Sequence, residues 1–256
     1  MALKITFLGT GTSQGVPVIG SNHPVCLSDD PKDKRLRVSV LVSWDSHNFV
    51  IDCGPDFRQQ MLTHRITTLD GVLFTHEHSD HTAGIDDIRP FFFKQGDIPI
   101  YAHKRVVKAL KKRFGYIFNE KDRYPGAPAV EINYVKKGVD FHLAGKMITP
   151  VRALHNRLKV FGYRIDDFAY LTDVKSIKEK ELEKLKGTKI LVVNALRTES
   201  HHSHFNLEEA IHFVSQVKPE KAYFTHISHL MGFHAEVEKS LPENIHLAYD
   251  NLILEV

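Results

Sequence analysis

Thr75-His76-Glu77-His78-Ser79-Asp80-His81 is the stretch of sequence that decides the fold of this chain. Three imidazoles and the Asp80 carboxylate fall within six positions, directly after Gly71–Phe74, an apolar run that predicts a buried β-strand. Side chains alternate along an extended chain, so His76 and His78 share one side, and a turn brings Asp80 and His81 back towards them. Imidazole nitrogens and carboxylate oxygens suit divalent zinc, manganese or iron. The stretch therefore predicts a metal site where a strand ends, with its ligands divided between two neighbouring ions.

The H-x-H-x-D-H spacing of this stretch resembles the metallo-β-lactamase superfamily. A polar loop rich in histidine is the alternative explanation, because the chain has 17 histidines, but the spacing favours metal binding. In that superfamily a further His, a bridging Asp and a last His follow in order along the chain. Here the matching positions are His155, Asp173 and His226, and each follows a short apolar or strand-like run.

The resemblance gives each of these residues a role. It implies that one ion is held by His76, His78 and His155, that a second is held by Asp80, His81 and His226, and that Asp173 bridges the two. It also matches Asp52, in Val50-Ile51-Asp52-Cys53-Gly54, to a position behind the ligands. A carboxylate there would orient the ligand imidazoles.

Strand-like and helix-like segments alternate along the chain, which predicts a layered α/β body. The expected strands are Lys4–Leu8, Val38–Val42, Asn48–Ile51, Gly71–Phe74, Ile98–Tyr101, Lys159–Ile165, Phe168–Leu171, Lys189–Val193, Lys221–Phe224 and Leu252–Glu255. The expected helices are Asp56–Thr63, Lys104–Phe114, Ser176–Leu185, with Ser176 and Glu179 as a capping box, Leu207–Val217, capped by Asn206, and His234–Leu241. The resemblance makes this specific: residues 1–256 form a single domain, a four-layer αββα metallo-β-lactamase sandwich with the active site at the sheet edges.

Composition limits the classes of protein and of partner that this chain fits. With 256 residues and 42% hydrophobic content, the chain can bury a substantial core, and a net charge of +3 does not by itself imply a polyanionic partner. Cys26 and Cys53 lie far apart and do not suggest a disulfide framework. The N-terminal residues are strand-like rather than a signal peptide, and no apolar run approaches the ~20 residues that cross a bilayer. We expect a soluble cytoplasmic protein with no membrane partner.

Two ions about 3.5–4 Å apart can clamp the attacking and leaving oxygens of a displacement at phosphorus. A water between them loses its proton near neutral pH, so the hydroxide is the nucleophile and no Ser or Cys nucleophile is needed. The leaving alkoxide then needs a proton, and the segment Ser200–Leu207 supplies histidines just before a helix N-terminus. His204 is the expected proton donor, with His202 in reserve, and Asp80 is counted as catalytic as well as a ligand.

A narrower resemblance is to the cyclic phosphodiesterase subgroup of the phosphonate-degradation pathway (PhnP-like). The Gly9–Pro17 loop is similar to that subgroup's opening loop, and Thr225-His226-Ile227-Ser228-His229 to its closing motif. In the subgroup a His before a helix acts on the leaving group, which matches His204 in its His-Phe-Asn-Leu context. The resemblance implies a small or cyclic phosphodiester substrate, similar to a phosphoribosyl cyclic phosphate.

The subgroup also carries a structural zinc held by three cysteines and the last His of the closing motif. At those positions this chain has Ser21, His23, Cys26 and His229. A His23/Cys26/His229 set is a credible zinc site that is one ligand short of four, and Asp29, Asp30 or water could complete it. The alternative is that the site has decayed into an ordinary loop.

Two rival functions remain open. A nuclease related to the tRNA 3′-processing enzymes would share the metal motif, but its arm for gripping RNA would have to be Lys111–Gly138, which is short and mixed in charge, so nucleic acid is not an expected partner. A non-catalytic metal-binding module would have no need for the full ligand set and a leaving-group His. β-Lactams, thioesters and lactones are also substrates that such a fold can host. Superfamily members often dimerise, so a homodimer is compatible with the resemblance.

Overall fold

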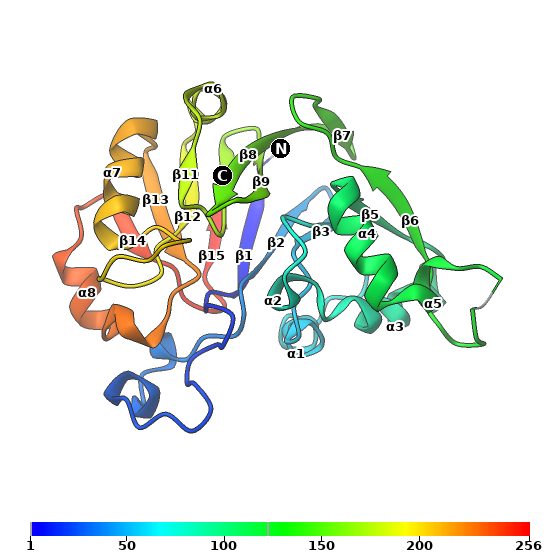
Figure 1. The fold of residues 1–256 in the computed structure, drawn as a ribbon, viewed down its shortest axis with the longest axis horizontal. Helices are drawn as coiled ribbons and strands as arrows, with labels where there is room; N and C mark the ends of the chain where they lie inside the picture. Colours follow the sequence, from blue (N-terminus) through cyan, green and yellow to red (C-terminus); the bar gives the residue numbers. More distant parts are fainter. Residues whose placement is uncertain (1, 122) are drawn as a thin grey trace.

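Two mixed β-sheets pack face to face, and helices cover the outer face of each sheet (Figure 1). The computed structural model describes residues 2–121 and 123–256. This arrangement is the four-layer αββα sandwich that the sequence predicts. Among the described residues, no helix has the length and apolar character needed to span a bilayer.

The first sheet has the strand order β15-β1-β2-β3-β4-β5-β6. Its strands are β1 (Lys4–Gly9), β2 (Ser39–Trp44), β3 (His47–Ile51), β4 (Gly71–Leu73), β5 (Ile98–Ala102), β6 (Val130–Tyr134) and β15 (Ile253–Glu255). The pairs from β15 to β3 are antiparallel, and those from β3 to β6 are parallel.

The second sheet repeats this plan with the order β11-β8-β9-β10-β12-β13-β14, and β7 also pairs with β8. Its strands are β7 (Phe141–Leu143), β8 (Lys146–His155), β9 (Leu158–Ile165), β10 (Phe168–Tyr170), β11 (Ser176–Ile177), β12 (Ile190–Asn194), β13 (Lys221–Thr225) and β14 (Ile245–Leu247). The β11–β8–β9–β10 pairs are antiparallel, and β10, β12, β13 and β14 run parallel. The two halves of the chain therefore have similar topology.

Three buried clusters hold the layers together. The central one lies between the sheets and contains Phe7, Val40, Tyr163 and Phe168. An outer cluster joins the first sheet to α1 (Phe57–Thr63), α3 (Arg89–Gln95), α4 (Lys104–Arg113) and α5 (Gly115–Phe118). The other joins the second sheet to the segment after α6 (Glu179–Leu182), to α7 (Leu207–Val217) and to α8 (His234–Ser240). Burial of these apolar faces is the main stabilising term, at roughly 25 cal/mol per Å² removed from water.

Two helices form where local sequence patterns predict them. The expected helix Lys104–Phe114 forms α4, in which the apolar residues Val106, Val107 and Leu110 are buried. At the start of α7 the Asn206 side chain accepts a hydrogen bond from the Glu209 N–H at 2.9 Å, and the Glu209 carboxylate accepts one from the Asn206 N–H at 3.0 Å. This reciprocal capping box confirms Asn206 as the N-cap.

The predicted helix Ser176–Leu185 is wrong. Ser176 and Ile177 form β11, which pairs with Leu154 and Ala153 at the edge of the second sheet. Only Glu179–Leu182 is α-helical, and Glu183–Leu185 forms a 3-10 turn. Pairing with the long strand β8 outweighs the local helical preference of this segment, because a sheet edge offers backbone partners that an isolated short helix lacks.

Strand β8 is absent from the sequence prediction although it carries His155. Its interior contains Pro150, which normally argues against a central strand. The proline is tolerated because β7 covers only the Lys146–Ile148 part of that edge and β11 only the Ala153–Leu154 part. Pro150 therefore lies at a gap in the pairing, where a backbone N–H is not required.

The strand ends determine where the site forms. Since parallel strands bring their carboxyl ends to one edge, the residues just after β3 and β4 lie together, as do those after β10, β12 and β13. Three residues there have left-handed backbone conformations: Asp52 (φ 64°), Asp173 (φ 58°) and His226 (φ 57°). Such conformations are uncommon outside glycine and concentrate at functional sites. Asp52 and His226 directly follow β3 and β13, and Asp173 lies three residues after the end of β10.

Candidate metal centre

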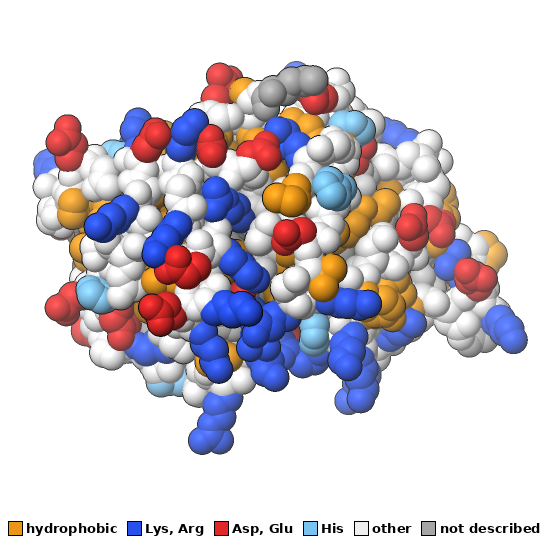
Figure 2. Space-filling view, turned by 90° about the horizontal axis from the view of Figure 1, so that it is seen from above, with side chains coloured by type: hydrophobic (Ala, Val, Ile, Leu, Met, Phe, Trp, Pro, Cys, Tyr) orange, Lys and Arg blue, Asp and Glu red, His pale blue; other side chains and the backbone are white. Residues whose placement is uncertain are grey.

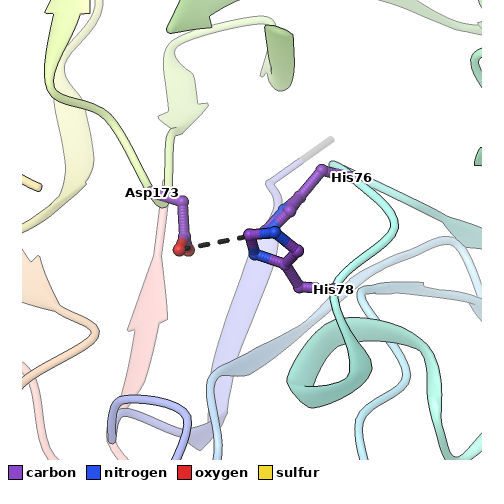
Figure 3. A group of neighbouring side chains, drawn as sticks. All are labelled: His76, His78 and Asp173. Carbon is purple, nitrogen blue, oxygen red and sulfur yellow. Dashed lines mark ion pairs between the residues drawn. The ribbon is translucent and has the colours of Figure 1, made fainter. Parts of the chain in front are cut away.

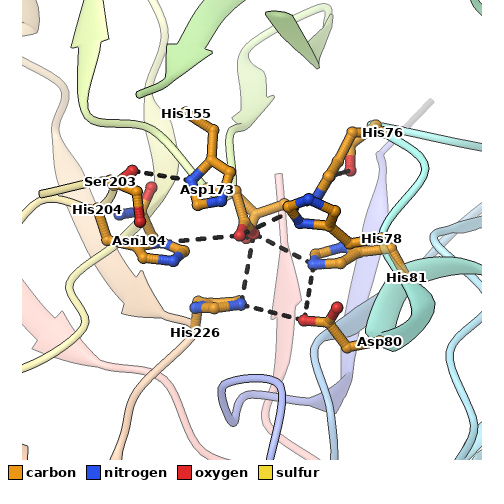
Figure 4. Close-up of polar contacts among 12 residues, drawn as sticks. His76, His78, Asp80, His81, His155, Asp173, Asn194, Ser203, His204 and His226 are labelled. Atoms are coloured by element: carbon orange, nitrogen blue, oxygen red, sulfur yellow. Dashed lines mark hydrogen bonds and ion pairs between the residues drawn. The ribbon is translucent and has the colours of Figure 1, made fainter. Parts of the chain in front are cut away.

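The predicted ligands converge at the edge where the strands end, and they come from both halves of the chain. Figure 4 shows His76, His78, Asp80 and His81 facing His155, Asp173, His204 and His226. The first four come from the loop after β4 and from α2 (Ser79–Thr82). The others follow β10 and β13, end β8, or precede α7. The centre is therefore shared by segments that are distant in sequence.

Ligand atoms gather here in three groups whose members lie within 4.8 Å of one another. The groups are His76, His78 and Asp173 (Figure 3); Asp80, His81 and His226; and His155, Asp173 and His204. The second group is the ligand set expected for the second ion. His155 lies beside the first group, with its ring 5.2 Å from that of His78 between centroids. Asp173 belongs to the first and third groups and also lies 3.2 Å from His81 and 3.4 Å from His226 of the second group, the position expected of a bridging carboxylate.

Distances around Asp173 match those between ligands of one ion. Its carboxylate oxygens lie 3.2 Å from His81 Nε2, 3.4 Å from His226 Nε2 and 4.0 Å from His76 Nε2. Two ligand atoms each about 2.1 Å from an ion at a tetrahedral angle are about 3.4 Å apart. The geometry has room for a cation between the atoms.

The ring nitrogens that face the centre also fit a metal. Within the part of the chain that the structure describes, the Nε2 atoms of His76, His81 and His226 are buried and have no hydrogen-bond partner. Leaving a buried polar atom unpaired costs about 1–3 kcal/mol, so such atoms need an explanation. Coordination of divalent ions by these lone pairs provides it, and the donor set of imidazole and carboxylate fits zinc, manganese or iron.

Asp52 is fully buried behind this layer and orients ligands on both sides. One carboxylate oxygen lies 2.6 Å from His81 Nδ1 and also accepts a hydrogen bond from the Thr75 hydroxyl at 2.7 Å. Thr75 in turn lies 3.0 Å from His76 Nδ1. A carboxylate can only accept, so His81 Nδ1 carries a proton, and the Thr75 hydroxyl, already donating to Asp52, accepts from His76 Nδ1. Both imidazoles are thereby held with Nε2 free for a metal.

His155 is fixed in the same way by a backbone group. Its Nδ1 lies 2.8 Å from the Ser203 carbonyl oxygen, which can only accept, so Nε2 is the free nitrogen. After Asp173, the Asn194 side chain accepts from the Val174 N–H at 2.6 Å and donates to the Val174 carbonyl at 3.1 Å. These bonds hold the turn that carries Asp173.

Electrostatics at the centre favour bound cations. Burial opposes ionisation of Asp173, but His226, His81 and His76 together hold the pKa of its carboxyl well below the ordinary value. Burial likewise opposes a charge on His81, yet Asp80, Asp173 and Asp52 raise its pKa well above the usual range. Three carboxylates around one imidazole therefore create a strongly negative, buried pocket, which a divalent ion would neutralise.

His204 lies at the edge of this centre and is only 8% exposed. Its Nδ1 is 3.6 Å from Asp173, and its ring stacks on that of His226 at 4.8 Å. Burial, only partly offset by Asp173, lowers the pKa of His204 to about 2. Its neighbour His202 is exposed, which places the reserve candidate outside the cluster.

The proposed structural zinc set is less closely assembled. The rings of His23 and His229 approach to 4.9 Å between centroids. His23 Nδ1, however, accepts from the Val25 N–H, and Cys26 Sγ from the Val18 N–H. Among the described residues, this trio is not one of the groups whose ligand atoms lie within 4.8 Å. A metal at His23, Cys26 and His229 stays a prediction.

Sequence reasoning assigned no role to several residues of the centre. Thr75, Asn194 and Ser203 act through hydrogen bonds to ligands or to their turns, and Arg105 and Arg113 contact the metal loop from α4. Thr75 and Asn194 carry a usable signal, since both are polar: Thr75 lies two residues after the buried strand β4, and Asn194 is the last residue of β12. Ser203 acts through its backbone, which no side-chain pattern reveals.

Comparisons with known proteins define the class of this fold and site. A sequence model described as the beta-lactamase superfamily domain matches residues 47–227. The chain therefore belongs to the beta-lactamase superfamily, which confirms the recognition made from the H-x-H-x-D-H motif.

Within the superfamily, the chain belongs with the PhnP family. It is similar to the solved structure described as a new diphosphatase from that family, with 40% identity, a TM-score of 0.93, and coverage of 100% of this chain and 98% of the other. Zn²⁺-bound PqqB from Methylobacterium extorquens shares the fold at 17% identity and a TM-score of 0.79, covering 99% of this chain and 100% of the other.

An octanoyltransferase of Porphyromonas gingivalis is 40% identical over 252 residues, which is 98% of this chain and 51% of that protein. The chain thus spans about half the length, or less, of the first curated relatives that it matches.

Proposed function

We propose that this chain is a metal-dependent phosphoesterase with two divalent ions, acting on a small phosphodiester of the cyclic ribose phosphate type. The observation that carries the proposal is the position of Asp173. Its carboxylate lies between 3.2 and 4.0 Å from nitrogens of His76, His81, His204 and His226, so it joins both halves of the ligand set. Family membership and 40% identity to a diphosphatase along the whole chain support phosphorus chemistry.

Divalent ions bound here would lower the pKa of a water molecule and stabilise negative charge on the phosphoryl oxygens. The protein's own part is to hold the ligands. Asp52 and Thr75 keep the protons of His81 and His76 on Nδ1, and the Ser203 carbonyl does so for His155. Because these protons point away from the centre, each Nε2 lone pair points into it. Lys and Arg side chains gather along one edge of the face shown in Figure 2.

His204 is the proposed proton donor to the leaving group. Its low pKa means that the ring is neutral before substrate arrives, so it offers an N–H rather than a positive charge. The anionic phosphodiester placed beside it would favour the protonated form, because a nearby opposite charge raises the pKa of an imidazole. An alkoxide leaving group needs this proton, whereas a good leaving group does not.

A second candidate is a diphosphatase, which the solved relative of that description favours. The two candidates differ in the leaving group. Hydrolysis of a diphosphate bond expels a phosphate, which departs as an anion, so His204 would matter little. Hydrolysis of an alkyl phosphodiester expels an alkoxide, for which His204 would matter greatly.

The test is metal-dependent turnover by protein stripped and reloaded with zinc or manganese. The substrates are a cyclic ribose phosphate, bis-p-nitrophenyl phosphate, a nucleoside diphosphate ester, an octanoyl thioester and a pre-tRNA. His204→Ala should lower turnover of the cyclic phosphate by roughly two to four powers of ten and affect the p-nitrophenyl ester far less. His202→Ala is the matched control from the same loop and should behave as wild type.

Three outcomes decide between the alternatives. Turnover of the diphosphate ester alone would favour the second candidate. Equal loss on both diesters in His204→Ala, with fewer bound ions, would make His204 a ligand, as its grouping with His155 and Asp173 also permits. Turnover only of the thioester or the pre-tRNA would refute the proposed substrate class.

A further inference from the structure

Helix α4 contacts the metal loop through two arginines that the proposed chemistry does not use. Arg113 donates hydrogen bonds to the Glu77 carbonyl at 2.8 Å, the Thr82 hydroxyl at 2.8 Å and the Ser79 hydroxyl at 3.2 Å. All three partners belong to the loop and short helix that carry His76, His78, Asp80 and His81. Arg113 therefore fixes the loop within the first half of the chain.

Arg105 makes a different connection. Its Nε lies 2.8 and 3.1 Å from the two carboxylate oxygens of Glu77, the residue between His76 and His78. The far end of the same guanidinium donates to the carbonyl of Lys159, which is 54 residues away. Lys159 belongs to β9, and the β8–β9 hairpin pairs Leu158 with His155. Arg105 thus links the metal loop of the first half to the hairpin that carries His155 in the second.

This link spans the two sides of the expected first-ion site. That ion would take His76 and His78 from the loop and His155 from the hairpin, so its affinity depends on the separation between loop and hairpin. By contrast, the expected site of the second ion takes no ligand from the hairpin, because its ligands are Asp80, His81 and His226. A planar guanidinium is suited to the task, because its fixed fork binds a carboxylate and a carbonyl together, whereas an ammonium has no such geometry.

We propose that Arg105, with Glu77, is a positioning residue that sets the spacing between the metal loop and the β8–β9 hairpin, and so selectively raises affinity for the ion at His76, His78 and His155. The pair is partly buried, with Arg105 32% and Glu77 20% exposed, so solvent screens it less than a surface ion pair. The inference rests on the proposed function only in requiring that two divalent ions bind.

The experiment is a titration of metal-free protein with cobalt(II) or zinc, followed by calorimetry and by the cobalt visible spectrum, without substrate. Arg105→Ala should weaken one of the two ions by roughly 10- to 100-fold and leave the other near its wild-type affinity, since loss of a group that supports ligands typically has that effect. Arg105→Lys should recover little of the lost metal affinity. Glu77→Gln should lower the affinity for the same ion, but by a smaller factor. Lys108→Ala, an exposed position on the same helix, is the matched control and should bind both ions normally.

The outcomes separate positioning from a general structural role. Equal weakening of both ions, or a large fall in the melting temperature of metal-free Arg105→Ala, would show that Arg105 serves folding and would overturn the proposal. Unchanged affinities would also overturn it. A wild-type protein that binds two ions but hydrolyses no phosphoester would refute the proposed function and leave this inference standing.

Discussion

Replacing Asp52 by Asn tests how the centre holds its imidazoles. The substitution preserves shape, and Asn tolerates the left-handed backbone of this position, where φ is 64°. The single oxygen of the new amide can still accept a hydrogen bond from the Thr75 N–H, which lies 2.8 Å from the carboxylate in wild type. The amide nitrogen then faces His81 Nδ1 and Thr75, where the carboxylate now accepts two hydrogen bonds.

A donor in that place changes the tautomer of His81. Its Nδ1 must accept from the new amide, so the neutral ring, the form that binds a metal, would carry its proton on Nε2, the atom that points at Asp80 and Asp173 from 3.2 Å. A metal would have to displace this proton. A hydrogen bond to a charged group contributes about 1.5–3 kcal/mol, and a tenfold change in affinity is about 1.4 kcal/mol. We therefore expect affinity for the ion at His81 to fall roughly 10- to 100-fold.

The assay is calorimetric titration of metal-free protein with zinc, with thermal unfolding to verify the fold. Asp70→Asn is a matched control, because Asp70 also lies 2.8 Å from an imidazole Nδ1, that of His47, and accepts from the Asn48 N–H at 2.8 Å, outside the metal centre. Asp70→Asn should bind both ions normally. Wild-type affinity for both ions in Asp52→Asn would refute the tautomer reasoning.

Three further predictions concern the centre and its surroundings. Asp173→Ala should leave fewer than two ions per chain by elemental analysis, and an unchanged metal content would contradict the bridging role. If a zinc is held by His23, Cys26 and His229, wild type should contain one zinc more than Cys26→Ser, and equal contents would mean that the loop binds none. Burial, with Arg35 donating towards its Nδ1 at 3.2 Å, lowers the pKa of His234 to about 4 from 6.5, so between these pH values the unfolded chain binds a proton that the folded chain does not. The free energy of unfolding in urea should therefore fall by about 2 kcal/mol from this group between pH 7 and pH 5, and His234→Gln should remove that part of the slope; an identical slope would refute the assignment.

Much of the fold could be predicted from the sequence because its signals are local. Apolar runs ending in His76 or Asp173, and helices such as Lys104–Phe114, are encoded in hydrophobic periodicity and caps within about a dozen residues. The family resemblance then supplied the layer order and the ligand list, which no local pattern contains. Failures occurred where pairing overrode propensity, as in β11 and in β8 around Pro150.

The sequence by itself determined which residue types stand at the strand ends: the histidines and aspartates of the centre, and Asp52 behind them. Only the tertiary structure decided how they meet. The Asp52–His81 contact, the His155 bond to the Ser203 carbonyl and the Arg105 link to Lys159 join residues 29, 48 and 54 positions apart. The first two contacts bring distant residues together within one half of the chain and the third joins the two halves, so all three depend on tertiary packing rather than on a local pattern. Their energy comes from excluding water around fixed donors and acceptors, an environment that exists only once the elements that carry them are packed together.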